Sequence, residues 1–179
     1  KELHSVRVNQ DKYGGLNFKP LSLIPATRIK WYWPNMLAQG KFHVFAGDGG
    51  IGKTQILCSI AATISKGGIF TGEREPCEQG KVLYLTGEDG AGDTIKPRVM
   101  ACGGVLDNVV VLDSTKNDGN LVSLTRNLDN ITDYLNDYGD YKLLIIDPLT
   151  AFCDDKFDNN SVTSVRSLAT KLSSLAEDT

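Results

Sequence analysis

Residues 41–54 read KFHVFAGDGGIGKT, an apolar segment that runs into a glycine-rich turn. We expect a short buried strand over residues 41–47 and an amphipathic helix over residues 54–66, because the apolar residues after the turn recur at helical spacing. The turn matches G-x-x-x-x-G-K-[ST] at every position, in the strand-to-helix context that this pattern requires. The sequence therefore predicts a phosphate-binding loop. Its residues are Gly47, Asp48, Gly49, Gly50, Ile51, Gly52, Lys53 and Thr54.

The chemistry of this loop depends on each of its parts. Glycines allow the backbone to curl, so that several N–H groups point inward at phosphate oxygens, and the helix N-terminus adds a partial positive charge. We expect the Lys53 ammonium to reach the β- and γ-phosphates as a catalytic cation, and the Thr54 hydroxyl to bind Mg²⁺. The sequence has no Asn-Lys-x-Asp motif for reading guanine, which favours ATP over GTP. The predicted ligand is therefore Mg-ATP.

Beyond the loop, segments typical of strands alternate with segments typical of helices. Strands are expected over residues 81–89, 108–113 and 141–147, and helices over residues 93–104, 121–139 and 160–179. Such alternation predicts a three-layer α/β domain with a mostly parallel sheet, which binds its ligands at the carboxyl ends of the strands. We expect residues 41–179 to form this core. Residues 1–40 are interpreted as an arm and lead-in that packs on the core through Trp31, Tyr32 and Trp33.

Two acidic positions at strand ends complete the predicted site. Asp147 ends an apolar strand, as the Walker B aspartate of phosphate-loop proteins does, and is expected to hold Mg²⁺ directly or through water. Pro148 also permits the simpler interpretation of a turn. Glu88 ends the strand that follows the first helix, where it could orient or deprotonate the attacking water. Asp89 remains the alternative base. Glu88, Asp89 and Asp93 could instead form an N-terminal cap cluster of the next helix, whose dipole they would suit.

The composition fits one globular domain without a membrane anchor. The chain has 179 residues, of which 41% are hydrophobic and 23% charged, and no apolar run is long enough to cross a bilayer. Residues 1–15 lack the apolar stretch of a signal peptide. Four cysteines without a CxxC pair indicate reduced thiols in the cytoplasm rather than a zinc site. The net charge of −3 argues against a domain coated in nucleic acid, but not against contact through a few basic loops.

Three stretches of sequence together resemble a known family. They are WYWPNMLAQGKFHVFAGDGGIGKTQ within residues 31–55, KVLYLTGEDG with DTIKPRVMACGG within residues 81–104, and LLIIDPLTAF with DNNSVTSVRSLATKLSSLAEDT within residues 143–179. They resemble the RecA-like P-loop ATPases of the RepA and AAA_25 type, the plasmid and phage hexameric replicative helicases. They are more distantly similar to the DnaB motor domain. The likeness extends from about Leu21 to the end of the sequence.

The resemblance implies a RecA-like ATPase core that acts as a helicase in DNA replication. Its subunits would assemble into a hexameric ring, with ATP bound between neighbours and single-stranded DNA as partner. Gly49 to Thr54 would carry the phosphate loop, Glu88 would be the catalytic glutamate and Asp147 the Walker B aspartate. Arg98 occupies the place of an arginine that these proteins often carry, and we expect a surface salt bridge for it.

The family continues past its final helix into further strands, which carry the γ-phosphate sensor, the DNA-contacting loops and the arginine finger. The sequence stops at Thr179, so we expect an incomplete core with an exposed strand edge. Two other functions stay open: a RecA-like switch or recombination ATPase without unwinding activity, and a small-molecule P-loop kinase. The kinase is disfavoured because the arginines are scattered along the sequence rather than grouped in a lid.

Overall fold

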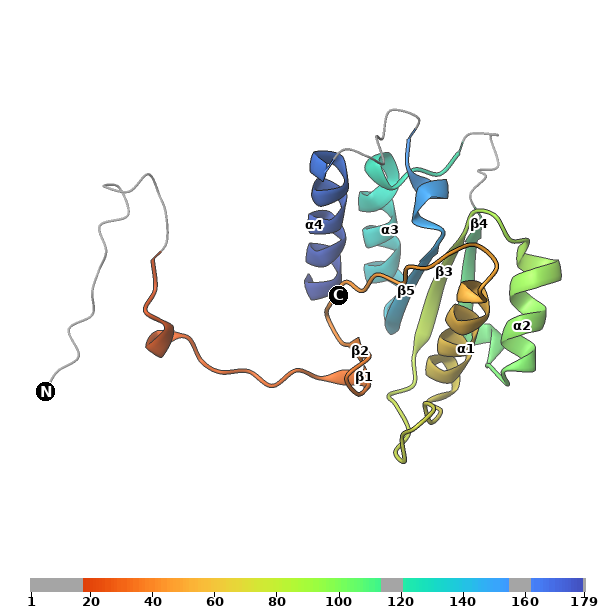
Figure 1. The fold of residues 1–179 in the computed structure, drawn as a ribbon, viewed down its shortest axis with the longest axis horizontal. Coiled ribbons are helices and arrows are strands. Elements are labelled where there is room, and N and C mark those ends of the chain that lie inside the picture. The colour runs from red at the N-terminus through yellow and green to blue at the C-terminus, as the bar shows by residue number, and fades with distance from the viewer. Residues whose placement is uncertain (1–17, 114–120, 155–161, 179) are drawn as a thin grey trace, which may run out of the picture.

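Three parallel strands in the order β4-β3-β5 lie at the centre of the molecule (Figure 1). The structure is a computed structural model that describes residues 18–113, 121–154 and 162–178. The strands of this sheet are β3 (Lys81–Thr86), β4 (Val109–Asp113) and β5 (Tyr141–Asp147). The helices are α1 (Lys53–Lys66), α2 (Lys96–Ala101), α3 (Leu124–Tyr138) and α4 (Val162–Asp178).

The two faces of β3 pack against different pairs of helices. Val82 and Tyr84 share a core cluster with residues of α1 and α2, whereas Leu83 and Leu85 share a second cluster with residues of α3 and α4. All four side chains are buried. Because a strand presents successive side chains to opposite faces, a strand covered on both sides has no polar face. The predicted three-layer α/β arrangement with a parallel sheet is confirmed (Figure 1).

The loop after β3 differs from the expected end of this strand. β3 ends at Thr86 rather than at residue 89, so Glu88 and Asp89 lie in the connection to the next helix. The Thr86 hydroxyl donates a hydrogen bond to the backbone carbonyl of Asp89 at 2.6 Å, which closes the turn. The helix expected over residues 93–104 consists of a π-helical segment, Ala91–Ile95, followed directly by α2.

The aromatic lead-in packs on the core through two of its three rings. β1 (Trp31–Trp33) and β2 (Leu37–Ala38) form a short antiparallel hairpin. Trp33 stacks on Phe70 with 4.9 Å between the ring centroids, and Tyr32 is half-buried against the same core cluster. The predicted packing is thus confirmed for Tyr32 and Trp33, whereas Trp31 is exposed. Residues 18–30 are exposed and extend away from the core (Figure 1).

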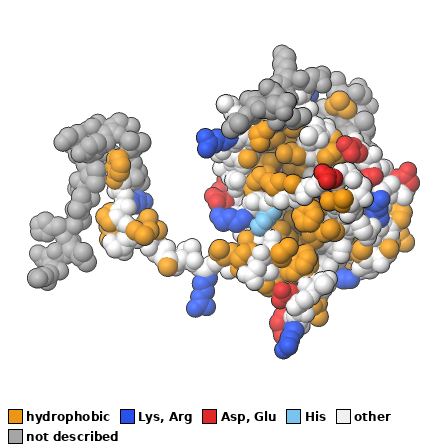
Figure 2. All heavy atoms as spheres, viewed as in Figure 1, with side chains coloured by type: hydrophobic (Ala, Val, Ile, Leu, Met, Phe, Trp, Pro, Cys, Tyr) orange, Lys and Arg blue, Asp and Glu red, His pale blue; other side chains and the backbone are white. Residues whose placement is uncertain are grey.

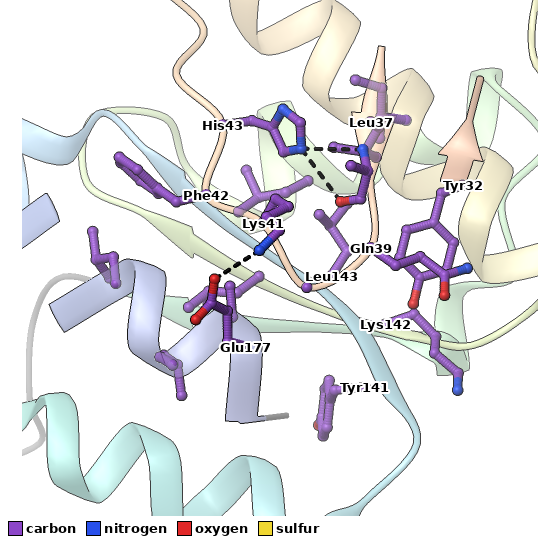
Figure 3. A pocket seen from close by; sticks show the side chains of 18 of the residues that line it. Tyr32, Leu37, Gln39, Lys41, Phe42, His43, Tyr141, Lys142, Leu143 and Glu177 are labelled. Carbon is purple, nitrogen blue, oxygen red and sulfur yellow. Dashed lines mark hydrogen bonds and ion pairs between the residues drawn. The ribbon is translucent and has the colours of Figure 1, made fainter. Parts of the chain in front are cut away.

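The strand expected over residues 41–47 is not formed. No strand pairing involves these residues in the part of the chain that the structure describes, and most of their side chains are exposed. A groove of about 990 Å³ lies between them and β5 (Figure 3). A strand exists only where its backbone groups pair with a neighbour, and these residues lie across the groove from β5, the edge strand, rather than against it. The apolar sequence of residues 41–47 was therefore not sufficient to make a strand.

Two polar contacts hold this segment beside the groove. His43 Nε2 accepts a hydrogen bond from the Ala38 N–H at 3.1 Å, and Lys41 Nζ donates one to Glu177 Oε1 of α4 at 2.7 Å (Figure 3).

Hydrophobic side chains gather on the face of the molecule shown in Figure 2. Among the described strands of the central sheet, β5 is an edge strand, and its outer side lines the groove.

No helix in the described ranges combines the length and the apolar character needed to span a membrane.

Candidate active site

The predicted phosphate loop lies between residues 41–46 and α1, and its shape depends on two glycines. Gly50 and Gly52 have φ angles of 78° and 92°, in the left-handed region that side chains other than that of glycine rarely adopt. A Cβ atom at either position would meet no atom within 4 Å. The requirement for glycine is therefore one of backbone conformation rather than of space. The open surroundings leave room for a ligand close to the backbone of the loop.

The loop concentrates positive charge at the start of α1. Gly52 is the N-cap residue of α1. Because glycine has no side chain, the cap residue offers no side-chain acceptor to the first backbone N–H groups of the helix. Lys53 Nζ donates hydrogen bonds to the carbonyls of Gly47 at 2.7 Å and Asp48 at 2.6 Å, which places its ammonium group at the loop. An N–H-rich helix start beside a lysine is suited to a polyphosphate.

Asp147 lies at the carboxyl end of β5, opposite Thr86 of β3. Its carboxylate Oδ2 accepts a hydrogen bond from the Tyr84 hydroxyl at 2.9 Å, and its backbone carbonyl accepts one from the Gly87 N–H at 3.0 Å. Asp147 and Lys53 line the same groove. The structure thus brings the lysine of the predicted phosphate loop and the predicted Walker B aspartate to one cavity.

Glu88 and Asp89 have different surroundings. Glu88 is exposed and is not among the residues that line the groove with Lys53 and Asp147. The Asp89 carboxylate lies 3.7 Å from the Arg98 guanidinium, which confirms the surface salt bridge expected for that arginine. Neither carboxylate occupies the N-cap position of the following helical segment, because Gly90 does. The alternative interpretation, in which Glu88 or Asp89 is the N-cap residue of the next helix, is therefore wrong.

The comparison with protein families gives a match over almost the whole chain. Residues 20–179 match the family model AAA_25, described as an AAA domain. The chain belongs to the AAA_25 family. The resemblance seen in the sequence is thereby confirmed, and with it the P-loop nucleoside triphosphatase fold. A search of curated proteins finds no match to this chain. Family membership supports the coarse function of a nucleotide-hydrolysing P-loop ATPase.

The oxygen donors of this AAA_25 domain suit Mg²⁺ bound together with a nucleotide. Within the described residues, no three or more His, Cys, Asp or Glu side chains come together as a metal-binding group. Mg²⁺ is commonly held by one or two protein oxygens, with waters and phosphate oxygens in its other positions. The Thr54 hydroxyl and the Asp147 carboxylate, both predicted from the sequence, are oxygen donors of that kind, but only Asp147 is among the residues that line the groove.

Sequence reasoning missed Tyr84, which contacts the predicted Walker B aspartate of this AAA_25 domain. The Tyr84 side chain is fully buried in the middle of β3, and its hydroxyl donates to Asp147. Burial and the nearby Asp147 charge raise the pKa of the Tyr84 phenol far above its ordinary value, so the group stays a neutral donor. A tyrosine in an otherwise apolar strand is the signal that was available, because a buried hydroxyl needs a partner.

Asp154 anchors the chain after β5 to the start of α3. Its carboxylate accepts a hydrogen bond from the Thr125 hydroxyl and pairs with the Arg126 guanidinium at 2.8 Å. Hydrogen bonds from Thr125 and Ser123, together with the charge of Arg126, lower the pKa of Asp154. This carboxylate belongs to a structural junction. The other two acidic residues of this segment, at positions 155 and 158, lie outside the described residues.

Proposed function

We propose that this AAA_25 domain binds Mg-ATP at residues 47–54 and hydrolyses it to drive a motor on single-stranded DNA. The observation that carries the nucleotide site is the placement of Lys53 and Asp147 on one groove, beside a loop whose glycines adopt left-handed conformations. Lys53 would neutralise charge on the β- and γ-phosphates. Thr54 and Asp147 would hold Mg²⁺, which supplies further neutralisation of the phosphate charge when bound.

Glu88 is the proposed catalytic base. Hydrolysis needs a group that orients the attacking water or accepts its proton near the γ-phosphate. Asp89 is already paired with a guanidinium at 3.7 Å, whereas the Glu88 side chain is exposed on the same loop. Asp89 would have to leave this partner to reach a water near the γ-phosphate. This contrast supports Glu88 over Asp89.

Matched substitutions on this loop test the base. Glu88→Gln should lower the rate of ATP hydrolysis by about 10²–10⁴-fold, because general-base catalysis contributes roughly that much. Binding of a fluorescent ATP analogue should remain close to that of the unsubstituted protein, since the phosphate loop is unchanged. Asp89→Asn is the control and should keep most of the activity. An active Glu88→Gln protein beside an inactive Asp89→Asn protein would reassign the base to Asp89.

The DNA motor is the finer part of the proposal and is supported by the sequence resemblance to hexameric replicative helicases. The experiment is ATP hydrolysis by the complete protein with and without single-stranded DNA, followed by a strand-separation assay. Stimulation together with strand separation supports a helicase, and nucleotide-dependent hexamers in native mass spectrometry would support the ring. Hydrolysis that ignores DNA would favour the switch, and phosphoryl transfer to a small molecule would favour the kinase. The cytoplasm is the proposed location, in keeping with four cysteines that are free thiols.

A further inference from the structure

Tyr84 contacts the predicted Walker B aspartate of the proposed nucleotide site through its hydroxyl group. The residue lies in β3, the middle strand of the described sheet, opposite Ile145 of β5 and Val111 of β4. Its ring belongs to the core cluster on the α1 side of the sheet. The hydroxyl donates to Asp147 Oδ2 at 2.9 Å, across from β3 to the end of β5.

The Tyr84 ring packs in the same cluster as the helix that follows the phosphate loop. Cys58 of α1 is completely buried and belongs to this cluster. Cys58 follows Lys53 by five positions on α1. Tyr84 therefore shares a core cluster with the helix that carries the phosphate-loop lysine, and its hydroxyl donates to the carboxylate at the end of β5.

We propose that Tyr84 is a positioning residue that fixes the Asp147 carboxylate for Mg²⁺ binding, an inference that rests on the proposed Mg-ATP site. A carboxylate at a strand end can rotate about its side-chain bonds. A hydrogen bond to Oδ2 restricts that rotation and leaves Oδ1 available to a cation. Groups that orient a metal ligand in this way are commonly worth about 10- to 100-fold in metal affinity.

The burial of Tyr84 separates this role from simple packing. The ring fills the core whether or not the hydroxyl is present, so a phenylalanine keeps the apolar contacts and removes only the hydrogen bonds. A purely structural hydroxyl would lower stability and nucleotide binding together when removed. Loss of a positioning hydroxyl would instead change how nucleotide binding depends on the Mg²⁺ concentration. Binding of metal-free nucleotide by the loop would stay unchanged.

The test titrates MgCl₂ against the full chain with a fluorescent ATP analogue for Tyr84→Phe and for the unsubstituted protein. We expect the Mg²⁺ concentration that gives half of the maximal Mg²⁺-dependent change in analogue binding to rise by about 10- to 100-fold in Tyr84→Phe. Affinity for the analogue in the presence of EDTA should change by less than about 2-fold, because Lys53 and the loop are intact.

Tyr134→Phe is the matched control. Tyr134 lies on α3 and is not among the residues that line the groove, and its hydroxyl accepts a hydrogen bond from the Tyr141 hydroxyl at 3.0 Å, so this variant also loses a tyrosine hydrogen bond. Its Mg²⁺ dependence should match that of the unsubstituted protein. An equal shift of the half-maximal Mg²⁺ concentration in both variants would overturn the proposal. So would a loss of affinity for the analogue in EDTA that is as large, in Tyr84→Phe, as the shift in the half-maximal Mg²⁺ concentration.

A double variant tests whether Tyr84 acts through Asp147. In an Asp147→Asn background the Mg²⁺ ligand is already impaired, so adding Tyr84→Phe should produce no further change in Mg²⁺ dependence. A full additional shift would show that Tyr84 acts on something other than Asp147. If the unsubstituted protein itself binds no Mg-ATP, the proposed function fails; if it binds and Tyr84→Phe is indistinguishable from it, only the role of Tyr84 fails.

Discussion

Gly52 carries a backbone requirement that Gly49 in the same loop does not share. The φ angle of Gly52 is 92°, and the residue is the N-cap of α1. Gly49 is not among the glycines with positive φ. A Cβ atom at either position would meet nothing within 4 Å. The two glycines thus allow backbone strain to be measured separately from crowding.

Replacing these glycines by alanine should give unequal losses of stability. Gly52→Ala forces an L-residue into the left-handed region and should lower the free energy of unfolding by about 1–2 kcal/mol. Gly49→Ala should change it by less than about 0.5 kcal/mol, because the position is open and needs no unusual backbone. Urea unfolding of both variants measures the difference. Equal losses would mean that the loop needs small residues for a reason other than φ.

The residues of the site were unequally predictable from the sequence. The phosphate loop follows from a local pattern in which each residue type has a chemical reason, and the structure places Lys53 and Asp147 on one groove as that pattern required. Tyr84 could not be assigned a partner, because its hydrogen bond joins residues 63 positions apart through the pairing of β3 with β5. Which strand pairs with which is a long-range property that no local spacing contains.

At the scale of the element, α1 depends on a buried hydroxyl near its C-terminal end. Ser65 has no exposed surface. Its Oγ donates to the Ala62 carbonyl at 2.9 Å and accepts from the Val105 N–H at 3.0 Å. The second bond connects α1 to the segment that precedes β4. Ser65 therefore orients the helix that carries Lys53 relative to the sheet.

Ser65→Ala should lower the free energy of unfolding by about 1–2 kcal/mol, because the Val105 N–H loses its acceptor. Ser59→Ala is the matched control on the same helix, since Ser59 is exposed, and its effect should stay within about 0.5 kcal/mol. Urea unfolding at neutral pH compares the two. A Ser65→Ala protein as stable as the control would show that water or a small shift of the backbone replaces the lost bond.

The elements themselves were predictable where their pattern is local. The apolar runs at β3, β4 and β5 and the helical periodicity of α1 and α3 gave the right element at the right place. Residues 41–47 show the limit of such reasoning, because an apolar run specifies burial and extension but not a pairing partner. In the described structure these residues lie across a groove from β5 rather than against it.

At the scale of the whole molecule, ion pairs connect segments that are distant in sequence. Lys41 pairs with Glu177 at 2.7 Å, Lys142 with Glu78 at 2.8 Å, and Arg126 with Asp154 at 2.8 Å. Each pair joins a different part of the chain to the core. Because at least one partner in each pair is more than half exposed, each pair is worth little alone and is weakened by salt.

The carboxyl groups of these pairs give stability a defined dependence on pH. Hydrogen bonding and charge from Lys142 lower the pKa of Glu78 below its ordinary value of 4.5, and those from Lys41 do the same for Glu177. A hydrogen bond from Thr125 is the main cause that lowers the pKa of Asp154 below 3.8. A lowered pKa in the folded state means that the stabilisation is complete above the unfolded pKa. It is lost as pH falls through the folded value.

The urea midpoint should therefore fall as pH is lowered from about 5 to about 3 at low ionic strength. Lys142→Met should make this fall shallower, because Glu78 then titrates near its ordinary pKa in both the folded and the unfolded chain. Lys171→Met, which removes an exposed lysine of α4, is the control for lost charge and should keep the slope of the unsubstituted protein. Adding about 0.5 M NaCl should reduce the slope in every variant, since salt screens exposed pairs. A midpoint that stays constant or rises between pH 5 and pH 3 would mean that these carboxylates gain nothing from their partners in the folded state.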